Sequence, residues 1–343
     1  MRRRRYPKIH IQSKNEFAKH ISSSRFSQSK ALSLINDVQK HFDQYWSDHP
    51  TQSKPGKWVR NAAGTNLGKL LELISEKVLK PNDEFLPNFI FGGISGLNHK
   101  AAVLHLLGKK RKRILLKLDI TKFFEQIRYE RVYHFLRDKC KCSDKGARLL
   151  ANMCCVSHGP KETPGSYKTI ARGFATSPRL AVWCNLDTFI RLERLVRKEL
   201  RGKDPRIAIY VDDVGITASR ASKEDMLKLY EKIKTVLVQD RNQPLPLNND
   251  KTKIIYHTGE TFDENGNYLG KWRFEHLGAQ MNRNSIALGS KPRKKLESAT
   301  LRWKESGRRD KVAKNQRKAL LHYKRYMEAQ PAPTSETRTN ARA

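Results

Sequence analysis

The chain has 343 residues, and its 69 lysines and arginines against 34 aspartates and glutamates give a formal net charge of +35. A surplus of this size repels itself unless a polyanion neutralises it, which argues against an enzyme of small metabolites and favours a nucleic-acid partner. No run approaches the roughly 18 apolar residues of a membrane-spanning helix, and the N-terminal MRRRRYPKIHI lacks the apolar stretch of a secretory signal. We therefore expect no membrane partner. The five cysteines lack zinc-knuckle spacing, so we expect them to be reduced thiols in a cytoplasmic protein.

The first part of the chain contains helical patterns separated by loops. Residues 1–50 are basic and mostly helical, with an apolar stripe from Leu32 to Tyr45 at helical spacing. The segment 51–64 is rich in basic and turn-forming residues, and a further helix is expected over 67–79. These patterns predict packing and, by themselves, no chemistry.

A strand followed by helices is expected from residue 113 onward. Alternating apolar residues predict a strand over RILLKLDI (113–120), with Asp119 near its end. One long amphipathic helix is expected over 177–200, with Ser177 as its N-cap and Pro178 in its first turn.

Two apolar, β-branched runs, IAIYV (207–211) and VGITA (214–218), are separated only by Asp212 and Asp213 and predict a tight hairpin. A helix over 226–238 and later short strands follow. The order of elements predicts an α+β fold, in which helices pack on one side of an antiparallel sheet.

The C-terminal part is strongly basic. Residues 291–325 contain 14 lysines and arginines against 3 aspartates and glutamates, and their pattern predicts a basic helical appendage. The segment after Gln330, PAPTSETRTNARA, is expected to be disordered.

Three aspartates are the strongest candidates for chemistry. Asp119 lies near the end of a buried strand, and Asp212 and Asp213 lie at the predicted hairpin. Carboxylates gathered on one sheet repel each other unless cations neutralise them, and Mg²⁺ prefers such oxygen ligands. Two such ions about 4 Å apart support phosphoryl transfer. The alternative is an ordinary turn, in which aspartate is common.

Five segments in order resemble the palm motifs of a reverse transcriptase. They are LDITKFFEQI (118–127), RGFATSPRLAVWCNLD (172–187), YVDD (210–213), LPLNNDKTKI (245–254) and FEHLGAQM (274–281). The resemblance implies a right-hand polymerase fold with fingers, a palm whose antiparallel sheet contains the YVDD hairpin, and a helical basic thumb. Its expected divisions are an N-terminal helical extension (1–50), fingers (51–112), palm with part of the fingers (113–285), thumb (286–330) and a disordered tail (331–343).

The resemblance also implies a metal site and a general acid. Two Mg²⁺ ions, replaceable by Mn²⁺, would be bound by Asp119, Asp212, Asp213 and the backbone carbonyl of Ile120. Lys251 would protonate the leaving pyrophosphate. Lys253 competes for that role, and a solvated surface lysine is the alternative for both.

Further residues are assigned by position in the resembling motifs. The residues expected to bind the nucleotide are Lys57, Arg60, Phe124, Arg172, Gly173 and Tyr210. The residues expected to bind the primer or the template are Ser177, Phe274, Leu277, Gly278, Lys294 and Lys295. Phe124 matches the aromatic gate that excludes a ribose 2′-hydroxyl, or else it is a core aromatic beside Phe123. Lys57 and Arg60 match a triphosphate clamp of the fingers, or else they are ordinary basic loop residues.

The pattern departs from most such enzymes at Arg172, where a glutamine is usual before the glycine. The resemblance is to the prokaryotic lineage of retron and group II intron enzymes, and it implies a stand-alone, defence-associated reverse transcriptase. The expected function is two-metal, RNA-directed DNA synthesis from dNTPs on a cognate noncoding RNA, with an effector or second polymerase as a further partner. The alternatives are a retron enzyme that makes branched RNA-linked DNA, an untemplated or protein-primed polymerase, and a non-enzymatic RNA-binding scaffold.

Overall fold

The computed structural model describes residues 6–53, 55–108, 112–239, 244–283 and 285–329. The chain divides into two compact units, each assembled from separate stretches of sequence. Unit 1 contains residues 1–96, 120–191 and 236–246, and unit 2 contains residues 97–119, 192–235 and 247–343. The expected disordered tail, 331–343, lies outside the described residues.

Unit 1 is mainly helical. Its helices are α1 (Lys14–Ile21), α2 (Gln28–His41), α3 (Asn66–Leu73), α5 (Tyr129–His134), α6 (Asp144–Cys154) and α7 (Ser177–Cys184). Two small antiparallel ribbons accompany them, formed by β1 (Ser47–Asp48) with β2 (Arg60–Asn61) and by β4 (Cys155–Ser157) with β5 (Lys168–Ile170). Serine and threonine side chains cap several of these helices, as at Ser13, Ser27 and Thr65, which satisfies N–H groups that the first helical turn leaves unpaired.

Two helices expected in this unit differ from the prediction. The helix expected over 67–79 is α-helical only to Leu73 and continues as a π-helical segment, Ile74–Leu79. The single long helix expected from Ser177 is interrupted at Asn185, where α7 ends and α8 (Leu186–Glu199) begins. Thr176, and not Ser177, precedes the first helical residue, while the Ser177 hydroxyl donates to the carbonyl of Ala171 at 2.6 Å.

Unit 2 is built on a six-stranded antiparallel sheet with the order β10-β9-β8-β3-β7-β6. The strands are β3 (Ile114–Asp119), β6 (Arg206–Tyr210), β7 (Asp213–Ala218), β8 (Lys253–Tyr256), β9 (Glu260–Phe262) and β10 (Tyr268–Lys271). The alternating residues Ile114, Leu116 and Leu118 are buried on one face of β3. The expected α+β fold, a mixture of helices and an antiparallel sheet, is confirmed.

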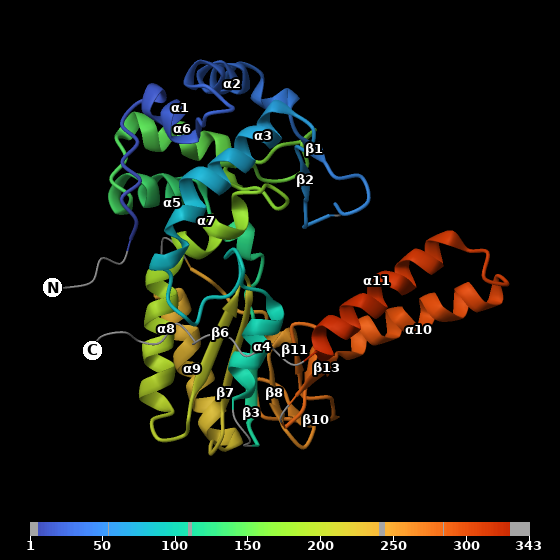
Figure 1. Cartoon of the computed structure of the whole chain (residues 1–343). Helices are drawn as coiled ribbons and strands as arrows, with labels where there is room; N and C mark the ends of the chain where they lie inside the picture. Colours follow the sequence, from blue (N-terminus) through green and yellow to red (C-terminus); the bar gives the residue numbers. More distant parts are fainter. Residues whose placement is uncertain (1–5, 54, 109–111, 240–243, 284, 330–343) are drawn as a thin grey trace. The chain divides into compact units, whose positions relative to one another are not determined.

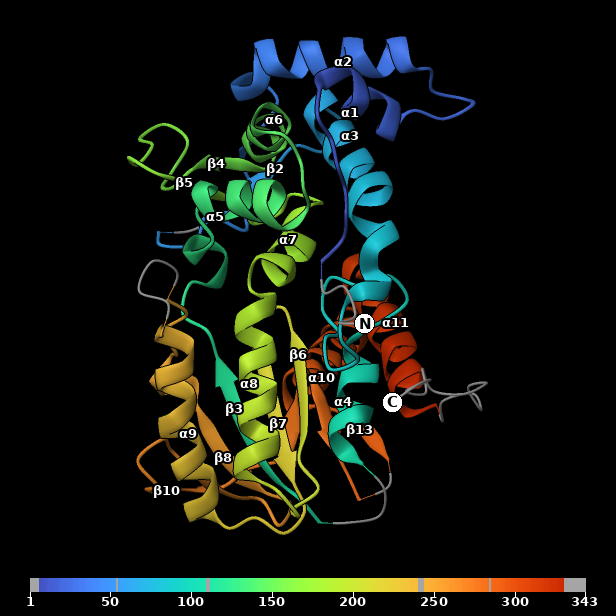
Figure 2. The same cartoon turned by 90° about the vertical axis from the view of Figure 1, so that its left-hand side faces the viewer.

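Helices cover both faces of this sheet, so the expectation of helices on one side only is wrong. The later part of α8 and most of α9 (Lys223–Val238) lie on one face, in front of the strands in Figure 2. Helix α4 (His99–Leu107) packs on β6 and β7 from the opposite face. There the hydroxyl of Thr217 donates to the Leu106 carbonyl at 2.7 Å. The sequence pattern hid this layer because α4 is apolar almost all round.

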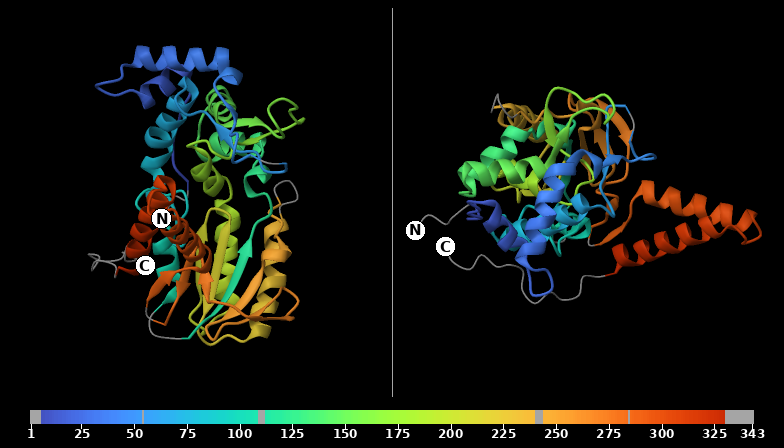
Figure 3. Two further views of the ribbon diagram at one scale, coloured as in Figure 1. Left: turned by 90° about the vertical axis from the view of Figure 1, so that its right-hand side faces the viewer. Right: turned by 90° about the horizontal axis from the view of Figure 1, so that it is seen from above.

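A small sheet and a helical hairpin complete unit 2. The sheet consists of β11 (Glu275–His276), β12 (Ala279–Met281) and β13 (Ile286–Leu288), and it leads into α10 (Ser290–Glu305) and α11 (Lys311–Glu328). Figures 1 and 3 show α10 and α11 side by side as a long hairpin. The basic appendage expected over 291–325 therefore consists of α10 and α11, whereas Ile286–Leu288, at the start of the expected thumb, is a strand. None of the described helices is both long and apolar enough to cross a membrane.

Candidate active site

The YVDD sequence forms the turn between β6 and β7. Tyr210 pairs with Asp213 in the ladder, so the two turn residues are Val211 and Asp212, one position earlier than the sequence predicts. Val211 has a φ of 59°, a left-handed conformation that a β-branched residue rarely adopts. Such backbone strain persists only where the surrounding structure enforces it, and it is concentrated at functional sites.

The ladder brings the aspartates of two strands together. Asp119 at the end of β3 lies opposite Asp213 at the start of β7, and residues opposite each other in a ladder point to the same face. Burial, together with the charges of Asp212 and Asp119, raises the pKa of Asp213 to about 6, although Lys117 and Lys251 act in the opposite direction. Asp212 and Asp119 therefore both act electrostatically on Asp213.

Lys251 and Lys253 have different partners. The Lys251 ammonium lies 3.2 Å from a carboxylate oxygen of Asp119, and its side chain is 61% exposed. The Lys253 ammonium lies over the Trp272 ring, 3.8 Å from its centroid. Of the two competing lysines, Lys251 is the one in contact with a candidate catalytic carboxylate.

The carboxylates of Asp119, Asp212 and Asp213 are chemically suited to bind a divalent cation, but their side chains do not converge on one point. In the part of the chain that the structure describes, no three His, Cys, Asp or Glu side chains converge as a metal site. The donor set nevertheless consists of carboxylate oxygens whose mutual repulsion a hard cation relieves. Ile120 follows β3 directly, and because its side chain carries no donor atom, only its backbone carbonyl is suited to the expected ligand role.

A histidine is buried beneath this face of the sheet. The His276 side chain is 1% exposed, and neither ring nitrogen has a hydrogen-bond partner among the residues that the structure describes. It lies against Gly215 of β7, where a Cβ atom would approach its Nε2 to 2.8 Å. Burial, with a smaller effect of Lys117, lowers the pKa of His276 to about 3.

This histidine makes folding sensitive to acid. Below pH 6.5 the unfolded chain protonates His276, whereas the folded chain does not until about pH 3, so stability falls as the pH falls. Between pH 7 and pH 5 we expect the free energy of unfolding to drop by about 2 kcal/mol more in the wild type than in a His276→Leu variant. Urea unfolding at the two pH values measures this difference. The matched change at exposed His20, His20→Leu, should keep the wild-type pH slope, and equal slopes for wild type and His276→Leu would contradict the assignment.

An aromatic cluster joins Tyr210 to α4 and α11. The His99 ring lies 6.5 Å from the Tyr210 ring, and the His99 Nε2 is 2.7 Å from the Tyr323 hydroxyl. Next to it, the buried Lys100 ammonium donates to the carbonyls of Tyr326 and Ala329 at 2.6 and 2.7 Å. These carbonyls belong to the C-terminal end of α11, where a cation is favourable. The cluster fixes the end of α11 next to the residue that begins the YVDD turn.

The other predicted residues of unit 2 differ in exposure. Leu277 and Gly278 form the tip of the β11–β12 hairpin, and their φ values of 51° and 72° correspond to a tight primed turn. Phe274 is buried, and its ring lies 5.1 Å from that of His257. Lys294 and Lys295 are exposed on α10. The hairpin tip and the two lysines are therefore accessible, whereas Phe274 has a packing role.

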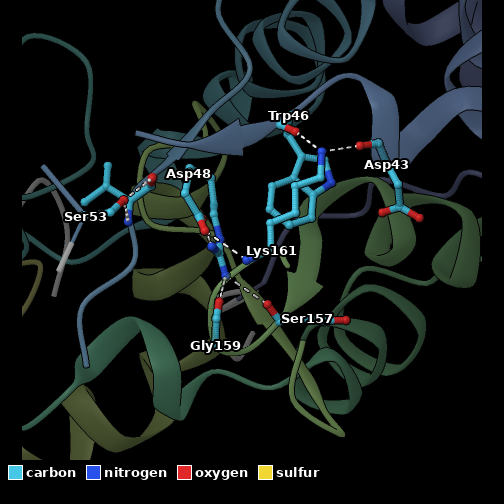
Figure 4. A network of polar contacts seen from close by, with 9 residues as sticks. Asp43, Trp46, Asp48, Ser53, Ser157, Gly159 and Lys161 are labelled. Atoms are coloured by element: carbon cyan, nitrogen blue, oxygen red, sulfur yellow. Dashed lines mark hydrogen bonds and ion pairs between the residues drawn. The ribbon is translucent and has the colours of Figure 1, made fainter. Parts of the chain in front are cut away.

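In unit 1, Arg60 lies inside a polar network, and Figure 4 labels its partners Asp48, Ser157 and Gly159. Its side chain pairs with Asp48 and donates to the carbonyls of Ser157, at 3.0 Å, and Gly159. Asp48 also accepts from the backbone N–H of Lys161 at 2.8 Å. Arg60 is 4% exposed, and its guanidinium ties β1 and β2 to the end of β4 and the loop after it. The expected contact of Arg60 with a triphosphate stays a prediction. Lys57 is exposed.

Phe124, Arg172 and Gly173 lie together in unit 1. The Arg172 guanidinium is 4.7 Å from the centre of the Phe124 ring and forms an ion pair with Glu125. The Arg60 N–H donates to the Arg172 carbonyl at 2.7 Å. Gly173 has a φ of 103°, and a Cβ there would lie 2.2 Å from the Arg60 carbonyl oxygen. The glycine is therefore required for a close approach within the protein itself.

Sequence reasoning missed several of these partners. It did not single out Glu125, which directly follows Phe124 and pairs with Arg172. The unusual arginine at 172 was the available signal, because a half-buried arginine needs a carboxylate partner. His99 and Lys100 lie far from Tyr323 and Tyr326 in sequence and gave no local signal.

Comparison with protein-family models assigns the chain to one family. The model of the reverse transcriptase (RNA-dependent DNA polymerase) family matches residues 52–281, more than half of the sequence. A search among curated proteins finds no significant match. The matched range contains the three aspartates, Lys251, Phe124 and Arg172. The chain belongs to the reverse transcriptase family, and it is an RNA-directed DNA polymerase, a nucleotidyltransferase that copies RNA templates into DNA from dNTPs.

Proposed function

We propose that the Asp119–Asp213 face of the sheet is the polymerase centre of a bacterial enzyme of the retron and group II intron-like lineage. The observation that carries this proposal is the ladder position of Asp119 opposite Asp213, with Asp212 in the adjoining strained turn. Tyr210, beside the turn, would support the incoming nucleotide. The divisions expected from the sequence, with fingers over 51–112, palm over 113–285 and thumb over 286–330, belong to the same proposal.

The carboxylates of this face would hold the catalytic cations. Asp119, Asp212, Asp213 and the carbonyl of Ile120 would bind two Mg²⁺ ions, or Mn²⁺ in their place. Bound there, the ions would lower the pKa of the primer 3′-hydroxyl and neutralise charge on the triphosphate. Within the protein, the Lys251 ammonium lies 3.2 Å from an Asp119 oxygen, so its release would free that oxygen for a cation.

Lys251, once released, is suited to protonate the leaving pyrophosphate. Its side chain is flexible and exposed, and it originates in the segment directly before β8. A Lys251→Ala variant is expected to lower kcat about 100-fold with little change in KM for the dNTP. Steady-state single-nucleotide incorporation measures both constants. Lys253→Ala is the matched control, and the assignment is wrong if Lys253→Ala is slow while Lys251→Ala keeps the wild-type kcat.

Contacts to the nucleic acid follow from exposure and charge. The tip at Leu277 and Gly278 would contact the primer end, and Lys294 and Lys295 would contact duplex phosphates, which gives affinity without sequence readout. In unit 1, Lys57 is available for the triphosphate, whereas Arg60 and Gly173 would shape the floor of the nucleotide site through their backbone contact. Ser177 and Phe274 would support these surfaces from within, since both are buried.

The biological substrate that we propose is one cognate noncoding RNA, copied during anti-phage defence, with an effector or second polymerase as a partner protein. The large positive charge favours recognition of a folded RNA by its shape and phosphates. Sequencing the nucleic acid that co-purifies from host cells tests this. The proposal predicts one small RNA together with DNA complementary to it, and the DNA should be missing from an Asp212→Ala/Asp213→Ala variant. A mixture of unrelated cellular RNAs, or DNA identical in both preparations, would contradict it.

A second candidate is untemplated or protein-primed synthesis. It is favoured by one observation, the ion pair of Arg172 with Glu125. Most enzymes of the lineage that the sequence resembles have glutamine at the position of Arg172. DNA whose sequence ignores every supplied RNA would support this candidate. A DNA joined to its RNA by a branch would instead specify a retron enzyme.

A further inference from the structure

The Phe124 ring is held by two different groups. It is 9% exposed, and one side of it meets the fully buried Phe123 ring edge-on at a centroid distance of 6.0 Å. The Arg172 guanidinium lies 4.7 Å from its centroid. A guanidinium over an aromatic face contributes about 0.5–2 kcal/mol, more as the pair becomes desolvated. The orientation of the ring therefore depends on where Arg172 lies.

Arg172 is itself fixed by the residue that follows Phe124. Its Nε and Nη2 donate to the two carboxylate oxygens of Glu125 at 3.2 and 3.1 Å. The two side chains are 20% and 13% exposed, so solvent competes weakly for this two-pronged pair. Lysine and glutamine cannot reproduce this fork, because neither carries two parallel N–H donors beside a planar cation.

The backbone of Arg172 is equally constrained. Its carbonyl accepts from the Arg60 N–H at 2.7 Å, and the next residue, Gly173, packs against the Arg60 carbonyl with no room for a Cβ. Arg60 is in turn anchored to Asp48 and to the Ser157 and Gly159 carbonyls. Both the backbone and the side chain of Arg172 are thus held in place, and its guanidinium bridges Glu125 and the Phe124 ring.

We infer that Arg172 and Glu125 are positioning residues that fix the Phe124 ring and thereby set the preference of the polymerase for deoxyribonucleoside over ribonucleoside triphosphates. The inference rests on the proposed role of Phe124 as the gate against a 2′-hydroxyl. A gate discriminates only if its ring cannot turn away, since a misplacement of about 1 Å in a positioned group can change a rate by about 100-fold. Most enzymes of the lineage that the sequence resembles have glutamine at this position. The arginine found here is explained by its contact with the Phe124 ring, which it holds in place.

The test is the ratio of kcat/KM for dGTP to kcat/KM for GTP in single-nucleotide incorporation opposite a template cytosine. Phe124→Ala should lower this ratio about 100-fold. Arg172→Gln, Arg172→Lys and Glu125→Gln should each lower it about 10-fold, the loss that corresponds to one cation–π contact. The Arg172→Gln/Glu125→Gln double variant should lower it no further than either single change, because both act through one pair. Arg128→Gln, at an exposed arginine that stacks on Tyr167 instead, is the matched control and should keep the wild-type ratio.

The outcomes separate this inference from the proposed function. Loss of incorporation by the wild type with every template would overturn the proposed function itself. An unchanged ratio in Phe124→Ala would overturn the gate and the inference with it. A lowered ratio in Phe124→Ala with unchanged ratios in Arg172→Gln and Glu125→Gln would overturn the inference alone. An equal fall in kcat for dGTP and GTP in those two variants, with the ratio kept, would show a merely structural role and would also overturn it.

Discussion

Replacing Asp212 and Asp213 together by alanine is expected to reduce dNTP incorporation by about three orders of magnitude or more. Phosphoryl transfer depends on charge stabilisation at the reacting oxygens, and Asp212 and Asp213 are the residues that we propose to provide it through bound cations. Their positions opposite and beside Asp119 make them a unit, so single changes should already cause most of the loss. Single-turnover primer extension measures the rate.

The same substitution should leave the fold intact. Burial and the like charges of its neighbours raise the pKa of Asp213 to about 6, which means that its ionised form is destabilised in the folded protein. Alanine removes that repulsion, so the melting temperature should stay equal to or above that of the wild type. Asp250→Ala is the matched control, because Asp250 is an exposed carboxylate beside Lys251, and it should polymerise normally. Wild-type polymerisation by the Asp212→Ala/Asp213→Ala variant would refute the catalytic assignment.

Gly173→Ala should destabilise unit 1 by about 3 kcal/mol or more, because two separate costs add. Its φ of 103° is unfavourable for any L side chain, and the new Cβ would lie 2.2 Å from the Arg60 carbonyl oxygen. Relief requires movement of β2, which Arg60 anchors to Asp48 and to the carbonyls of Ser157 and Gly159. Urea unfolding followed by circular dichroism measures the change.

A second glycine in the same unit separates the two costs. Gly64 has a φ of 76°, and nothing lies within 4 Å of a Cβ built there. Gly64→Ala therefore carries only the conformational cost, about 1 kcal/mol. Similar losses in the two variants would show that the contact between Gly173 and Arg60 is not tight, and would remove the support it gives to the position of Arg172.

The central sheet could be predicted from the sequence because its signals are local. Ile114, Leu116 and Leu118 alternate along β3, and the YVDD turn interrupts two β-branched runs. The turn was predicted one residue too late, since Asp213 reads as a turn residue by composition but takes its place in the ladder opposite Asp119. Strand pairing outweighed the local preference of aspartate for turns.

Features that depend on distant partners could not be predicted in the same way. The apolar pattern of 177–200 continues through Asn185, whose side chain donates to the Ala181 carbonyl at 2.7 Å where the helix breaks. Arg60 reads as a free basic loop residue, yet its partners Ser157 and Gly159 lie about a hundred positions later in the chain. Arg172 and Glu125 are likewise separated by 47 positions. The resemblance placed these residues near a nucleotide site, but only the structure gives their contacts.

The most direct test of the account is primer extension by the purified full chain on a defined RNA template, with Mg²⁺ and the four dNTPs, followed by sequencing of the product. We expect DNA complementary to the RNA, made by the wild type and absent with the Asp212→Ala/Asp213→Ala variant. DNA that does not follow the template, or equal synthesis by both proteins, would contradict the claim that the Asp119–Asp213 face is a template-directed polymerase centre.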